Sequence, residues 1–154
     1  MITIHAACAQ KTASADISKV HVFAETRHMG NVPVDENGNQ GRGYYIVYKV
    51  YLEIKGDHIP EWTAAVKSGK TLPLSNTETL SGAAILIGKN AATGEAVNIT
   101  PAKGNHFYKL EFVNNQVADN DDPTDSITLK GKYKGANISY PVTTITPLET
   151  MPVP

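Results

Sequence analysis

Residues 44–54 alternate with a period of two between two kinds of side chain, and this run limits what the chain can form. One set of alternate positions is entirely apolar or aromatic, whereas the other mixes aromatic residues with Lys49 and Glu53. Such alternation of β-branched and aromatic residues is typical of a β-strand. At about 3.3 Å per residue, the strand would be about 35 Å long. We expect its first face to line a core and its second face, too apolar for water, to be shared with another subunit.

Other segments of the chain carry shorter β patterns separated by turn residues. Residues 1–9 predict a first strand and residues 11–16 a polar turn. The glycine of residues 91–94 predicts a hairpin turn. The remaining predicted strands are 18–28, 79–88, 95–100, 106–113, 126–133 and 137–145. The sequence therefore predicts one mainly β domain over residues 1–146, followed by a proline-rich C-terminal tail at 147–154.

One segment favours a helix instead. A proline near its start and Gly69 after its end match the preferences of helix termini. Ile59, Trp62 and Val66 would fall on one stripe of a helical surface. We therefore expect a helix at about residues 59–68, anchored on the sheet by these three side chains.

The segment 31–43 is rich in glycine and asparagine and contains a strong turn signal at Asn37 and Gly38. Connections of this length are uncommon unless they are functional or disordered. We predict a long extended loop whose polar groups contact a neighbouring subunit. The candidate contact residues are Asp35, Glu36, Asn37, Gln40 and Arg42.

The overall composition excludes some partners. Fourteen basic and 15 acidic residues give a net charge of −1, which offers no electrostatic attraction to nucleic acid or an anionic membrane. Cys8 stands alone, so neither an intramolecular disulfide nor a cysteine-based metal site can form. No apolar run approaches the length of a membrane span. Residues 1–10 lack the pattern of a signal peptide, so we expect any export to proceed without one.

The sequence contains no recognisable catalytic or metal-binding motif. The histidines His5, His21, His28, His58 and His106 lack metal-ligand spacing. The acidic loop 118–125 could hold calcium through Asp119, Asp121, Asp122 and Asp125, but it lacks the EF-hand spacing and glycine. We therefore predict no enzyme activity, no catalytic residues, no cofactor and no bound metal.

The order of these elements resembles the haemolysin-coregulated protein (Hcp) family, the inner-tube subunits of type VI secretion systems. The resemblance begins with the strand 18–28, the loop 31–43 and the long strand 44–54. It continues through the predicted helix and the string that ends it, Ala65-Val66-Lys67-Ser68-Gly69-Lys70-Thr71-Leu72-Pro73. The segments 105–117 and 126–133 are similar to two later strands of the family. The similarity covers about residues 18–140.

The resemblance implies a tail-tube-like β-barrel or sandwich of two sheets with one short helix. It implies homohexameric rings, which stack into a tube that assembles in the cytoplasm and is secreted, with effector proteins as possible cargo in the lumen. Spike, sheath and baseplate proteins of the secretion machine would be further partners. The residues expected at the lumen or the subunit interface are Lys49, Glu53, Lys109, Glu111, Lys130 and Lys132.

Two other functions fit the same sequence. The first is the tail-tube protein of a phage or a phage-derived contractile particle, which shares this fold. The second is a secreted β-sandwich module that binds glycans or calcium through the tyrosines and the acidic loop. The latter predicts a monomer or dimer, whereas a tube subunit predicts rings.

Overall fold

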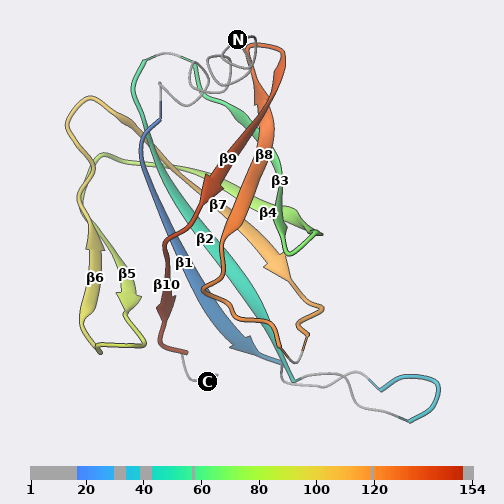
Figure 1. Cartoon of the computed structure of the whole chain (residues 1–154). Helices are drawn as coiled ribbons and strands as arrows, with labels where there is room; N and C mark the ends of the chain where they lie inside the picture. Colours follow the sequence, from blue (N-terminus) through green and yellow to red (C-terminus); the bar gives the residue numbers. More distant parts are fainter. Residues whose placement is uncertain (1–16, 30–33, 39–42, 57, 119, 151–154) are drawn as a thin grey trace, which may run out of the picture.

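A computed structural model describes residues 17–29, 34–38, 43–56, 58–118 and 120–150 of the chain, and the secondary structure of this part is entirely β (Figure 1). The mainly β fold predicted from the sequence is confirmed. The strands are β1 (Ile17–His28), β2 (Tyr44–Ile54), β3 (Glu61–Lys67), β4 (Lys70–Leu80), β5 (Ile85–Lys89), β6 (Ala96–Ile99), β7 (His106–Asn114), β8 (Ile127–Tyr133), β9 (Ala136–Val142) and β10 (Ile145–Leu148).

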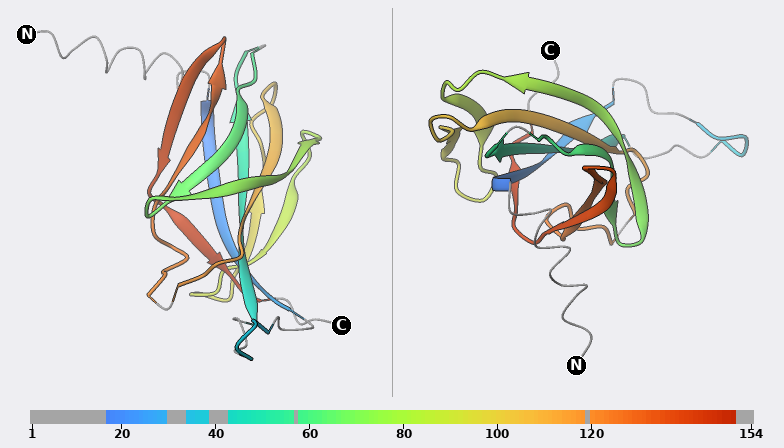
Figure 2. Two further views of the ribbon diagram at one scale, coloured as in Figure 1. Left: turned by 90° about the vertical axis from the view of Figure 1, so that its right-hand side faces the viewer. Right: turned by 90° about the horizontal axis from the view of Figure 1, so that it is seen from above.

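Eight strands form one sheet in the order β10-β1-β2-β7-β4-β3-β8-β9, and β5 and β6 form a separate hairpin. All pairs are antiparallel except β1 with β10, which run parallel. The large sheet curls into a half-barrel (Figure 2). Because β9 leads directly into β10, the two ends of the sheet are joined by two residues of chain.

The inside of the half-barrel is filled by side chains. Tyr48, Val50 and Leu52 have no exposed surface, and they belong to a core cluster with inward residues of β1, β3, β4, β7, β8, β9 and β10. The first face of β2 therefore lines the core as the alternation predicted. Within the part of the chain that the structure describes, this packed interior leaves no channel through the half-barrel.

The second face of β2 contacts the chain's own β5–β6 hairpin. Tyr51 and Phe107 stack with ring centroids 6.1 Å apart, and Ile99 of β6 belongs to the same cluster. Val47 is also almost completely buried, with 1% of its surface exposed. The prediction that another subunit covers this face is wrong for these residues, because burial is already complete within one chain.

The predicted helix at 59–68 is wrong, since residues 61–67 form strand β3. A β-bulge between Trp62 and Ala64 shifts the register against β8, so the inward positions become Trp62, Ala65 and Lys67. Because of the bulge, the buried positions Trp62 and Ala65 are three residues apart, a spacing that is also typical of one face of a helix. Trp62 is buried as expected, but 49% of the surface of Ile59 is exposed.

The glycine that was expected to end the helix instead turns a hairpin. Ser68 and Gly69 have φ angles of 51° and 77° between β3 and β4. Positive φ at both central residues is the requirement of a two-residue type I′ hairpin. Val66, the third residue of the predicted anchor, pairs with Thr71 of β4 and is only partly buried.

Other predicted boundaries shift where the alternation is weak. The predicted strand 79–88 is wrong, because β4 ends at Leu80 and β5 begins at Ile85. The predicted strand 137–145 is two strands, β9 and β10. The first two residues of the predicted tail, Pro147 and Leu148, pair with β1. The predictions for residues 1–16 lie outside the described residues.

Gly131 of β8 allows the bulged part of β3 to approach closely. It pairs with Trp62, and a Cβ atom at this position would lie 2.3 Å from the backbone oxygen of Glu61. We expect Gly131→Ala to lower the free energy of unfolding by about 3 kcal/mol, the upper end of the usual cost of overpacking. Gly82→Ala is the matched control, because a Cβ atom there meets nothing within 4 Å. Equal denaturation midpoints for both variants would contradict this packing.

Candidate assembly interface

The second half of β4 has an unpaired edge. Residues 70–73 pair with β3, whereas residues 74–80 pair only with β7, on the opposite side. A bulge at Ser75 interrupts the pairing with β7 near the start of this second half, and the Ser75 hydroxyl donates a hydrogen bond to the backbone oxygen of Glu111 (3.2 Å). Residues 75–79 are all exposed. Within the described residues, no strand pairs with this edge, so its backbone groups remain available to another chain.

A cavity of about 410 Å³ lies where β3 and β4 diverge. Thr77 and Thr79 of the free edge line it, together with Trp62, Tyr108 and Leu110. The Trp62 indole nitrogen donates a hydrogen bond to the Tyr108 hydroxyl at 2.9 Å. Burial raises the pKa of Tyr108 to about 12, although the hydrogen bond from Trp62 opposes the shift. Tyr108 is therefore a neutral structural group at neutral pH.

The opposite end of the strand row β10-β1-β2-β7-β4 is also incompletely paired. Strand β10 covers only residues 22–25 of β1, which leaves residues 17–21 without a described partner on that side. The two unpaired edges therefore lie at opposite ends of one continuous row of strands. This arrangement suits a subunit that contacts one neighbour on each side.

Charged side chains form a row across the outer face of β1, β2, β7 and β4. The Glu25 carboxylate accepts a hydrogen bond from the Arg27 side chain at 2.7 Å, and it forms an ion pair with the Lys49 ammonium at 2.6 Å. Burial alone would raise the pKa of Glu25, but the hydrogen bonds and charges of Lys49 and Arg27 lower it overall. Lys109 lies 3.2 Å from Glu111 and 3.4 Å from the Glu78 carboxylate.

The predicted lumen or interface residues separate into three groups. Lys49, Lys109 and Glu111 belong to this charged row. Lys49 of β2 lies directly opposite Glu111 of β7 in the strand register. Lys130 and Lys132 lie instead on the exposed face of β8. The Lys130 ammonium there donates to the Ser139 hydroxyl at 2.7 Å.

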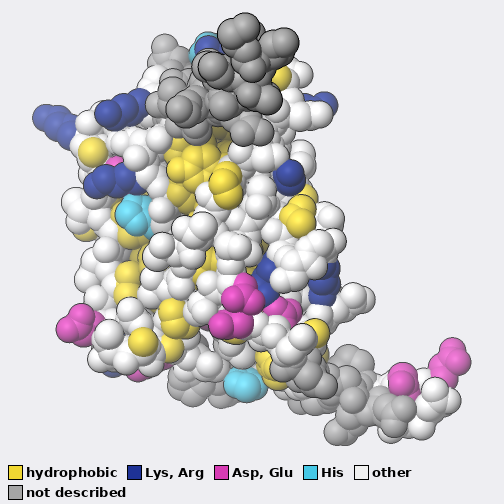
Figure 3. Space-filling model, in the orientation of Figure 1, with side chains coloured by type: hydrophobic (Ala, Val, Ile, Leu, Met, Phe, Trp, Pro, Cys, Tyr) yellow, Lys and Arg dark blue, Asp and Glu magenta, His cyan; other side chains and the backbone are white. Residues whose placement is uncertain are grey.

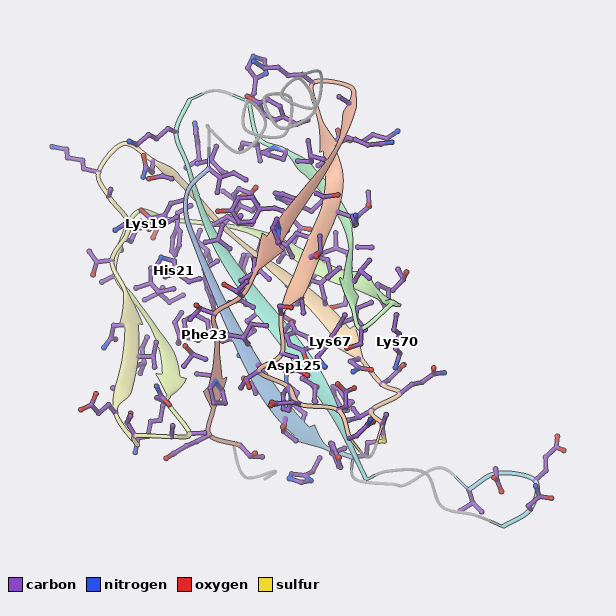
Figure 4. The ribbon with its side chains drawn as sticks, viewed as in Figure 1. Lys19, His21, Phe23, Lys67, Lys70 and Asp125 are labelled. Carbon is purple, nitrogen blue, oxygen red and sulfur yellow. The ribbon has the colours of Figure 1, made fainter. Side chains whose placement is uncertain are left out.

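Glu53, the sixth predicted residue, lies beneath the β5–β6 hairpin with 1% of its side chain exposed. It accepts hydrogen bonds from the Ala102 backbone at 2.7 Å and from Asn105 at 3.3 Å, and His21 lies 3.4 Å away (His21 is labelled in Figure 4). Burial raises its pKa, but these donors lower it overall. Glu53 thus ties the loop after β6 to the sheet and faces no open surface.

The predicted contact loop is described only in part. Asp35, Glu36 and Asn37 are exposed, and Gln40 and Arg42 lie outside the described residues. The Asn37 backbone donates to the Asp35 carboxylate at 2.9 Å, and Gly38 donates to the Asp35 backbone oxygen at 3.0 Å. The predicted turn is therefore confirmed at residues 35–38.

The carboxylates of the acidic loop contact protein groups. The Asp121 carboxylate forms an ion pair with the Lys67 ammonium and accepts a hydrogen bond from the Asn114 side-chain amide at 3.2 Å. Lys67 and Lys70 are labelled beside this loop in Figure 4. Asp122 accepts from the Thr124 backbone at 2.9 Å. Across the described part of the chain, no group of three or more His, Cys, Asp or Glu residues is placed to hold a metal ion.

The sequence did not reveal the free edge of β4 or the participation of Glu25 and Arg27. The only available signal was the polar stretch 75–79, which does not alternate and so resembles a loop. No helix in the described residues is long and apolar enough to cross a membrane. Comparisons with protein families, with curated proteins and with solved structures gave no match.

Proposed function

We propose that this chain is a structural subunit of a hexameric ring that stacks into the secreted tube of a type VI secretion system. The observation that carries the proposal is the pair of unpaired edges at opposite ends of one strand row. In a ring, the β4 edge of each copy would meet the β1–β10 end of the next copy. Such a heterologous contact generates a closed ring when the rotation closes.

The packed half-barrel supports a lumen formed between copies. Its interior is filled, so a channel in the assembly must lie against the outer surface of each subunit. We assign the charged row around Lys49, Lys109 and Glu111 to that channel or to its margin. Its charges of both signs are paired within the chain, which gives a polar, nearly neutral wall for effector proteins.

The exposed tip at residues 35–38 would contact a neighbouring copy or the next ring. Contacts with spike, sheath and baseplate proteins follow from the same assignment. A tail-tube subunit of a phage or phage-derived particle would use the same edges in the same way. The proposal assigns no catalytic step and no cofactor to the protein.

Thr77→Lys is expected to abolish ring formation, because lysine on an exposed strand edge blocks pairing with another strand. Thr71→Lys is the control: Thr71 is also exposed and lies in the half of β4 that β3 already covers. Negative-stain images and light scattering should show rings of about six times 16.6 kDa for the parent and the control. A monomeric parent at tens of micromolar, or rings in both variants, would refute the proposed contact.

A further inference from the structure

A cavity of about 700 Å³ lies between the outer face of the sheet and the β5–β6 hairpin. Its lining includes the charged side chains of Glu25 and Arg27 on β1 and of Lys49 on β2, together with apolar residues of β5 and the end of β10. The volume falls within the range of about 300–1,000 Å³ that is typical of small-molecule sites, which are mostly apolar with a few convergent polar groups.

The apolar part of the lining comes from Leu86, Ile87 and Leu148. Ile87 and Leu148 pack in the outer cluster beneath the hairpin, whereas 66% of the surface of Leu86 is exposed. Figure 3 shows hydrophobic side chains on the surface over β5 and β10. The Glu149 backbone donates a hydrogen bond to the Lys89 backbone oxygen at 2.8 Å, which joins the end of β10 to β5. The apolar wall is therefore formed before a ligand binds, which lowers the cost of binding.

The charged part of the lining carries one positive charge in excess. Arg27 and Lys49 both contact Glu25, one at each carboxylate oxygen, so two cations share a single anion. The other charged lining residues, Lys89 and Glu149, have opposite signs and leave this excess unchanged. A guanidinium has five N–H donors and an ammonium three, so both cations can bind a further anion besides Glu25.

We propose that this cavity binds a small amphipathic monocarboxylate of the medium-chain fatty-acid type. The carboxylate would accept charge-assisted hydrogen bonds from Arg27 and Lys49, and the hydrocarbon chain would lie along the apolar wall. Glu25 is a positioning residue in this site, because it holds the two cations beside each other. A ligand with one negative charge balances the excess of one positive charge, whereas a neutral or cationic amphiphile does not.

The site is independent of the proposed ring. Neither β4 nor residues 17–21 of β1, the two edges assigned to ring contacts, line the cavity. Its ligand would contact one chain only, so failure of this proposal would leave the proposed assembly untouched, and failure of ring formation would leave the site intact.

Isothermal titration calorimetry of the full chain with octanoate at pH 7 tests the site. Saturable binding of one octanoate per chain with a Kd of about 1 mM or below is expected. Octanol has the same chain without the charge and should bind at least about tenfold more weakly. Lys49→Met removes the excess charge and should weaken octanoate binding to the level of octanol while leaving octanol binding unchanged.

A second pair of variants tests the apolar wall without changing a buried residue. Leu86→Asp removes apolar lining and adds a negative charge, so it should weaken octanoate binding at least about tenfold. Ile59→Asp is the matched control, because Ile59 is also an exposed apolar residue, with 49% of its surface exposed, and lies outside this cavity. It should bind octanoate as the parent does.

Three results would overturn the proposal. The first is the absence of saturable octanoate binding to the parent at millimolar concentrations. The second is equal binding of octanoate and octanol, because the charged cluster would then not recognise the carboxylate. The third is an equal loss of binding in Leu86→Asp and Ile59→Asp, which would place the octanoate outside this cavity.

Discussion

Trp62→Ala is expected to lower the free energy of unfolding by about 3–5 kcal/mol, one of the two largest effects in this protein. The indole is 5% exposed and packs in the main core, so its removal leaves a cavity. Its truncation also removes the hydrogen bond to the Tyr108 hydroxyl, which then lies in the core without its donor. Urea denaturation, at concentrations where light scattering gives a monomer, measures the change.

Two further variants separate packing from the hydrogen bond. Trp62→Phe keeps most of the apolar area and loses only the donor, so its cost should be well below that of Trp62→Ala. A double-mutant cycle of Trp62→Phe with Tyr108→Phe should give a coupling of about 1 kcal/mol. If Trp62→Ala costs less than about 1 kcal/mol, the indole is not in the core and the placement of β3 against β8 is wrong.

The strands that the sequence predicted well have one apolar face that is buried in the core and a second face of mixed character. Residues 44–54 and 106–113 alternate cleanly, because each inward residue reaches the core inside the half-barrel. Period two follows directly from the pleat of a strand, so this signal is local. Glycine is an equally local signal, and it correctly predicted the turns at residues 35–38 and 91–94, where Gly38 and Gly94 have positive φ.

Strands β3 and β4 could not be predicted this way. The bulge after Trp62 inserts one residue and moves the next inward position to Ala65, a change that depends on its pairing with β8. The second half of β4 is exposed on both faces, so residues 75–79 carry no alternation. Both features come from tertiary pairing, which overrides the local pattern.

The candidate site depends on register even more strongly. Glu25, Lys49 and Glu111 share one face because of the register of three strands: Lys49 lies opposite Glu111 on β7 and diagonally from Glu25 on β1. A slip by one residue would turn each side chain to the other face. The sequence identified Lys49 and Glu111 as charges on strand faces but gave no means to separate them from Glu53, which is buried and bonded to the loop after β6.

Asp121→Asn is expected to lower the free energy of unfolding by about 3–5 kcal/mol at neutral pH. Its partner Lys67 lies on the inward side of β3 with 2% of its side chain exposed. Without the carboxylate, the ammonium remains buried and loses the opposite charge that directly contacts it, although the charge of the more distant Asp122 still acts on it. Chemical denaturation of the parent and the variant at pH 7 measures the difference.

The effect of Asp121→Asn should disappear in acid. Burial alone would raise the pKa of Asp121, but the hydrogen bond and charge of Lys67 lower this pKa overall, below the usual value of an aspartate. A carboxyl group whose folded-state pKa is depressed stabilises the protein above its unfolded pKa, and this contribution is lost as the pH falls through the folded-state value. The stability of the parent should therefore approach that of Asp121→Asn as the pH falls below about 4.

A second substitution identifies the buried charge as the cause. Lys67→Met in the Asp121→Asn background removes the uncompensated ammonium while keeping an unbranched side chain of similar length. It should recover most of the lost stability, because apolar replacement of a buried ion pair is often neutral or stabilising. If the double variant remains as unstable as Asp121→Asn, or if the difference from the parent persists unchanged at pH 2, the ion pair is not what holds the acidic loop against β3.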